Sequence, residues 1–194
     1  MFKKKYLNVI TLIIVLCIAM VFIFTKTRIT RYHLNAFTDY DNYEPMSPTI
    51  MMSDTFDVDI RPDSLNQGDL VAVKVYEEGI GVSRIVAKPG DEVYLGFGNL
   101  YVNDVLFDES FLAEEQKSWY YGRPLENGEI CHGKYFMMDG EYYKLADDEY
   151  FILNDNRDAT SGTDHFHGVI KDYDIIGKVV NVYRGDAVIK ENEL

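Results

Sequence analysis

A stretch of twenty uncharged residues near the amino end constrains this chain most. Residues 6–25 read YLNVITLIIVLCIAMVFIFT and lie between Lys5 and Lys26. At a helical rise of about 1.5 Å per residue the stretch would be about 30 Å long, the thickness of the hydrocarbon core of a bilayer. A cleaved secretory signal would have a shorter apolar core and a cleavage site of small residues. We therefore expect a retained transmembrane helix with a basic flank on each side.

Charge is divided unevenly along the chain. Residues 1–31 carry six basic residues and no acidic one, whereas residues 32–194 carry 13 basic and 32 acidic residues. Basic residues on both sides of the apolar stretch leave its orientation undecided by the positive-inside rule. The acidic remainder would repel phosphate groups, so a nucleic-acid partner is not expected. We expect two parts: an anchor region, 1–31, and one further domain, 32–194.

Beyond residue 32 the sequence changes to short runs with the composition of β-strands. The runs are rich in Val, Ile, Tyr and Phe and are bounded by Gly, Asp, Asn and Pro. The domain is therefore expected to be mainly β, with residues 104–148 inserted as a small cap subdomain. The expected strands are 55–60, 70–76, 81–86, 92–95, 100–102, 135–138, 141–145, 150–153 and 175–183.

The cysteines and histidines give no sign of a disulfide, a metal site or a cofactor. Cys17 lies inside the apolar stretch and Cys131 lies far from it, so a bridge would have to join a bilayer-embedded thiol to the other domain. The four histidines come without a second cysteine nearby and without ligand spacing. We expect no disulfide, no metal and no cofactor.

Three motifs in the domain carry a resemblance to a known family. The first is Pro-Met-Ser-Pro-Thr-Ile at 45–50. The second joins Gly-Asp-Leu-Val at 68–71 to 83–93, SRIVAKPGDEV, and the third runs from Asn-Asp-Asn-Arg at 154–157 to Ile-Ile-Gly-Lys at 175–178. Together they resemble the motifs of the type I signal peptidases, membrane-bound serine proteases that remove signal peptides. The resemblance implies a β-rich domain on the outer side of the cytoplasmic membrane.

The residues that would carry catalysis are replaced. Signal peptidases use a Ser/Lys dyad, in which a serine hydroxyl attacks the scissile carbonyl and a desolvated lysine amine takes the proton. At the serine position stands Pro45, which has neither a hydroxyl nor a backbone N–H. At the lysine position stands Ser83, which is no base near neutral pH, and Arg84 stays protonated. Asn154 replaces the glycine of the third motif. We expect no catalytic residue.

A relocated active site is the alternative. On an extended segment Ser47 would point to the same face as Pro45, about 6 to 7 Å further along. This fallback nucleophile would need a base, and the candidates are Lys74, His165 and His167. Without such a base, Ser47 is a turn residue before Pro48.

Other motif residues are expected to bind a client peptide or to stabilise a turn. Under the resemblance, a client peptide would add a strand to a sheet edge along a groove. The candidate groove residues are Met46, Pro48, Ser83 and Ile85, although Met46 is equally compatible with a core position. Asp155, Asn156, Arg157 and Ser161 are expected to form a structural turn, in which Arg157 can clamp a carboxylate.

The leading hypothesis is a non-catalytic accessory protein that binds a client. Signal-peptidase-like proteins of Gram-positive bacteria act in the assembly of pili by sortases, and the short anchor and altered dyad resemble that subgroup. The client would then be a pilin, the sortase or both. The alternatives are an active signal peptidase with a rearranged site and a degenerate paralogue without a client.

Overall fold

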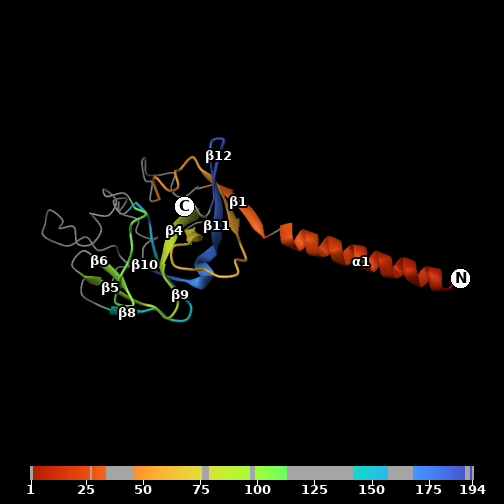
Figure 1. Cartoon of the computed structure of the whole chain (residues 1–194), viewed down its shortest axis with the longest axis horizontal. Coiled ribbons are helices and arrows are strands. Elements are labelled where there is room, and N and C mark those ends of the chain that lie inside the picture. Colours follow the sequence, from red (N-terminus) through yellow and green to blue (C-terminus); the bar gives the residue numbers. More distant parts are fainter. Residues whose placement is uncertain are drawn as a thin grey trace.

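A computed structural model shows a long helix that projects from a β-rich body (Figure 1). It describes residues 2–26, 28–33, 46–75, 79–96, 99–112, 142–156, 168–190 and 193. The helix, α1 (Phe2–Lys26), covers the stretch predicted to span a membrane. Among the described residues, however, no helix meets the length and hydropathy of a membrane span. The transmembrane anchor therefore stays a prediction.

Eight antiparallel strands form the main sheet. In spatial order, seven of them are β1 (Ile29–His33), β2 (Thr55–Asp59), β11 (Ile175–Arg184), β3 (Leu70–Val75), β4 (Gly79–Ala87), β9 (Glu149–Leu153) and β10 (Gly168–Lys171). The eighth, β12 (Ala187–Lys190), pairs with the end of β11. A 3₁₀ turn, Asp172–Asp174, joins β10 to β11. The mainly β fold expected from the sequence is confirmed.

A smaller sheet lies beside the main one (Figure 1). Its order is β7 (Val105–Leu106), β6 (Asn99–Val102), β5 (Glu92–Gly96) and β8 (Tyr142–Lys144). The predicted cap, 104–148, supplies β7 and β8, which pair with strands outside it. Residues 113–141 of the cap lie outside the described residues, and the domain boundaries stay predictions.

Eight of the nine predicted strands match observed ones, and the ninth, 135–138, lies outside the described residues. Four observed strands were not predicted: β1, β7, β10 and β12. They have two to five residues, and β1, with the sequence ITRYH, lies at a sheet edge with alternate residues exposed. Such strands carry too few apolar residues to be recognised by alternation.

Apolar residues fill both faces of the main sheet. On β3, Leu70 and Ala72 join one core cluster while Val71 and Val73 join another, which explains the unbroken apolar run Leu-Val-Ala-Val. Met46 and six other buried side chains complete the first cluster. A third cluster packs Val93, Leu100 and Val102 of the small sheet against Phe151 and Leu153 of β9 and residues near them.

Two arginines attach the segment after α1 to the sheet. Arg28 Nε donates to both carboxylate oxygens of Asp59 at 2.7 Å. Arg31 Nε donates to Asp57 Oδ1 at 2.7 Å, and the Tyr183 hydroxyl donates to Asp57 Oδ2 at 2.7 Å. The hydrogen bond from Arg31 is the main cause that holds the pKa of the Asp57 carboxyl below its usual range. The first strand is thus fixed by charge as well as by pairing.

Acidification should weaken this attachment. The pKa of Asp57 is lower in the folded than in the unfolded chain, so its contribution to the free energy of unfolding is present above about pH 4 and is lost as the pH falls through the folded pKa. Thermal unfolding in detergent should show that the Tm of the wild type falls more between pH 7 and pH 3 than the Tm of Asp57→Asn. Parallel losses in the two proteins would contradict this prediction.

Gly177 lies where two strands approach closely. It follows the irregularity between Ile175 and Gly177 in the pairing of β11 with β3. A Cβ atom on Gly177 would lie 2.2 Å from the backbone oxygen of Asp59 and 2.8 Å from Val58 Cγ1. Gly177, near the end of the third motif, is therefore required by the packing of β11 on β2.

Gly177→Ala is expected to destabilise the domain. The backbone oxygen cannot rotate away as a side chain would, so the strands must separate, at a cost of about 1–3 kcal/mol or more. Chemical unfolding measures the loss. Val188→Ala on the exposed β12 is the control and should change the free energy of unfolding by less than about 0.5 kcal/mol. Equal changes in the free energy of unfolding for the two variants would show that β11 and β2 leave room for a Cβ atom at position 177.

Candidate functional site

The first motif forms a turn. Residues 46–49 are turn residues, and the Ile50 amide donates to the Met46 oxygen at 2.9 Å. Met46 and Ile50 are buried in the core, so the packing of these two side chains holds the turn in place. The relocated-site alternative assumed an extended segment from Pro45 to Ser47, but residues 46 and 47 belong to the turn. Pro45 itself lies outside the described residues. The core reading of Met46 is the one that the structure bears out.

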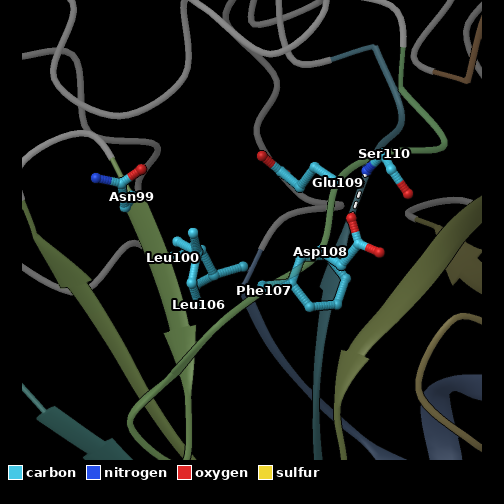
Figure 2. A pocket seen from close by; sticks show the side chains of 7 residues that line it. All are labelled: Asn99, Leu100, Leu106, Phe107, Asp108, Glu109 and Ser110. Carbon is cyan, nitrogen blue, oxygen red and sulfur yellow. Dashed lines mark hydrogen bonds between the residues drawn. The ribbon is translucent and has the colours of Figure 1, made fainter.

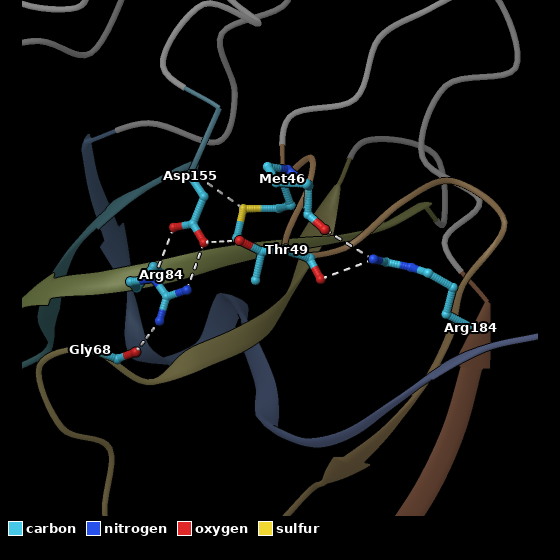
Figure 3. Close-up of polar contacts among 7 residues, drawn as sticks. Met46, Thr49, Gly68, Arg84, Asp155 and Arg184 are labelled. Atoms are coloured by element: carbon cyan, nitrogen blue, oxygen red, sulfur yellow. Dashed lines mark hydrogen bonds and ion pairs between the residues drawn. The ribbon is translucent and has the colours of Figure 1, made fainter. Parts of the chain in front are cut away.

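A buried ion pair joins the second motif to the third. Arg84 Nε donates to Asp155 Oδ1 at 2.8 Å, and Arg84 Nη2 donates to Asp155 Oδ2 at 2.6 Å. The side chains are 6% and 0% exposed. Arg84 Nη1 also donates to the Gly68 oxygen at 2.8 Å, and Gly68 has a positive φ of 92° (Figure 3). The guanidinium is thus surrounded by acceptors from two separate loops.

The same carboxylate holds the turn of the first motif. Thr49 Oγ1 donates to Asp155 Oδ2 at 2.6 Å, and the Asp155 amide donates to Met46 Sδ at 3.3 Å. Figure 3 shows Thr49 and Met46 beside Asp155, with Arg184 approaching from the other side of the turn. All three motifs therefore meet at Asp155.

Arg184 of β11 fastens the turn from its second side. Its Nη2 donates to Asp54 Oδ2 at 2.6 Å and to the backbone oxygens of Pro48 and Thr49 at 3.0 and 3.2 Å. The Asp54 side chain is 0% exposed. Because charge-assisted hydrogen bonds are stronger than neutral ones, the turn that follows the nucleophile position is held rigidly.

A hydrogen-bonded pair of neutral side chains lies at the position where the resemblance implies the dyad lysine. Ser83 Oγ donates to Asn154 Oδ1 at 2.8 Å, and both residues are 0% exposed. Ser83 lies on β4 and Asn154 directly follows β9, one step beyond the strand pair Arg84 and Leu153. Adjacent residues of β4 thus bond to adjacent residues after β9.

The predicted groove residues lie mostly inside the domain. Met46, Ser83 and Ile85 are buried, whereas Pro48 is exposed and Ser47 is half-buried. Lys74, a candidate base, is exposed on β3, and its Nζ donates to the backbone oxygen of Tyr173. The groove therefore stays a prediction. His165, His167, Arg157 and Ser161 lie outside the described residues.

Sequence reasoning missed the partner of Asp155 and the roles of Thr49, Asp54 and Arg184. It expected a local turn at Asp155, whereas the carboxylate bonds to Arg84, 71 residues away. A signal was present, because an acidic residue inside one motif and a basic residue inside another are natural partners. Asp54 and Arg184 lie outside the core of any motif and gave no signal.

The segment after β7 covers part of the site. The Phe111 ring lies 4.5 Å from the Arg84 guanidinium carbon, a cation–π contact. Two pockets border this segment. One, of about 450 Å³, is lined by Leu106, Phe107 and neighbours (Figure 2). The other, of about 690 Å³, reaches from Phe111 to Gly68. Neither Ser83 nor Asn154 lines either of these two pockets.

Comparison with known proteins gives the family. The model of the family "Signal peptidase, peptidase S26" matches residues 4–184. The chain belongs to this family, and its fold is the signal-peptidase fold. The match includes the predicted membrane span and all three motifs, so the resemblance read from the motifs is confirmed.

The relatives include proteins named as signal peptidases and proteins named as inactive signal peptidases. "Signal peptidase I P" of Bacillus subtilis subsp. natto is 27% identical over 185 residues, which cover 90% of this chain and 89% of the relative. "Inactive signal peptidase IA" of Staphylococcus aureus (strain MRSA252) is 28% identical over 137 residues, 69% of this chain and 71% of the relative. A crystal structure of a signal peptidase I from Enterococcus faecalis V583 is 21% identical, with a TM-score of 0.41, and covers 60% of this chain and 97% of that one.

Removing the charge of Asp155 should destabilise the domain strongly. Asp155→Asn would leave the Arg84 guanidinium buried without a counter-charge, and breaking a buried pair on one side costs about 3–5 kcal/mol. Chemical unfolding in detergent measures the loss. Asp63→Asn is the matched control, because Asp63 is 93% exposed and lies 3.5 Å from Arg28. The control should unfold like the wild type, and a similar result for Asp155→Asn would contradict the central role of the pair.

Proposed function

We propose that this chain is a membrane-anchored, non-catalytic member of the signal peptidase family that binds a protein client. The observation that carries the proposal is the state of the lysine position. Ser83 is buried there and donates to Asn154 at 2.8 Å. A Ser/Lys mechanism requires an amine at this point that accepts a proton from the nucleophile, and a serine hydroxyl cannot do so near neutral pH.

The frame around the lost dyad supports a binding function. The turn of residues 46–49 is held by Asp155 and Thr49 on one side and by Arg184 on the other. A rigid surface near the turn suits the recognition of an extended peptide, because little order has to be imposed when the peptide binds.

The proposed setting is the assembly of surface pili. The client would be a pilin, a sortase or both, in a Gram-positive cell membrane, with the domain of residues 32–194 on the outer side. The support is the resemblance of the short anchor and altered dyad to the accessory proteins of that process. The helix α1, with twenty uncharged residues between Lys5 and Lys26, supports the anchor.

The wild-type protein is expected not to cleave a preprotein. Full-length protein in vesicles would be incubated with a preprotein that carries a signal peptide, beside an authentic signal peptidase as positive control. Cleavage by the wild type that Ser47→Ala abolishes would establish a relocated active site instead. Cleavage that survives Ser47→Ala would also refute the non-catalytic proposal.

Client binding is tested in a separate experiment. Photo-crosslinking from Pro48, the exposed residue of the turn, should capture a purified pilin or sortase in vesicles, and loss of residues 1–26, which leaves β1 intact, should reduce the yield. Crosslinking from Val188 on β12 is the matched control. Equal yields from the two positions would show that the turn is not part of the binding surface.

A further inference from the structure

Two departures from the family motifs touch each other. Ser83 stands where the family has lysine, and Asn154 stands where it has glycine. The two positions are 71 residues apart in the sequence, yet the hydroxyl of one donates to the amide oxygen of the other at 2.8 Å. Both residues are 0% exposed, so water does not readily replace either partner of this hydrogen bond.

The contact leaves no direct path for a longer side chain at position 83. A lysine would extend two methylenes and an ammonium group beyond the place of the serine oxygen. The Asn154 amide lies 2.8 Å from that oxygen, inside the space that such a side chain would enter. Glycine at 154 would leave this space open, because it has no side chain. The interior is close-packed, so such an overlap requires either strain or a displaced backbone.

We infer that Asn154 is a second determinant of the missing peptidase activity, because its side chain occupies the space of the dyad lysine. Loss of the base is then a paired change: serine at 83 supplies the donor, and asparagine at 154 supplies the acceptor and the volume. Restoring serine at 45 and lysine at 83 is not enough to rebuild the dyad. This inference rests on the proposed absence of catalysis and adds a residue to its cause.

The first test measures stability, which does not depend on activity. In the wild type, Asn154→Gly should lower the Tm by about 3–8 °C, because it removes the acceptor of a buried hydroxyl. In the Ser83→Lys protein, the same substitution should raise the Tm, because it opens space for the longer side chain. Asn156→Gly is the matched control and should change the Tm equally in both backgrounds. Additive effects of Ser83→Lys and Asn154→Gly would overturn the inference.

The second test measures cleavage of a preprotein in vesicles. Pro45→Ser/Ser83→Lys should gain at least about tenfold in rate when Asn154→Gly is added, a change of about 1.4 kcal/mol in the barrier. Equal rates of the two variants would overturn the inference. Cleavage by the wild type would instead refute the proposed function, so the two failures are distinguishable.

Discussion

The arrangement of the site depends on one buried ion pair. Removing two charges from water is costly, and their attraction offsets that cost only when further hydrogen bonds satisfy both groups. Here Arg84 has the Gly68 oxygen and Asp155 has Thr49 as additional partners. The pair thereby fixes the position of the chain after β9. Through the hydrogen bond from Thr49 it also fixes the position of the turn of residues 46–49. None of these contacts involves Ser83, so they do not depend on the side chain at that position.

The sequence predicted most strands of the domain because their side chains alternate or form continuous apolar runs. β3 is recognisable because both of its faces are buried. β1 and β12 are not, because they are short and partly polar. The position of the site was predictable from the motifs, but its contacts were not. Arg84 and Asp155 are 71 residues apart, and only the pairing of β4 with β9 brings them together.

A catalytic group can be replaced without cost to the fold only if its neighbours change too. A buried lysine and a buried hydroxyl make different demands on the space and the partners around them. At this site the demands of Ser83 are met by Asn154. The Ser83 hydroxyl and the Asn154 amide oxygen thus satisfy each other inside the domain. The two residues are therefore best regarded as one structural unit.

The connection between α1 and the sheet limits how far the domain can lie from the end of the helix. Two residues separate Lys26 from Ile29, and β1 is then paired with β2 along its whole length. Arg28 and Arg31 add ion pairs to Asp59 and Asp57 within this short distance. A tether of this kind has almost no free length. The domain therefore stays close to the end of the helix, and a partner held near that end would meet it at a high local concentration.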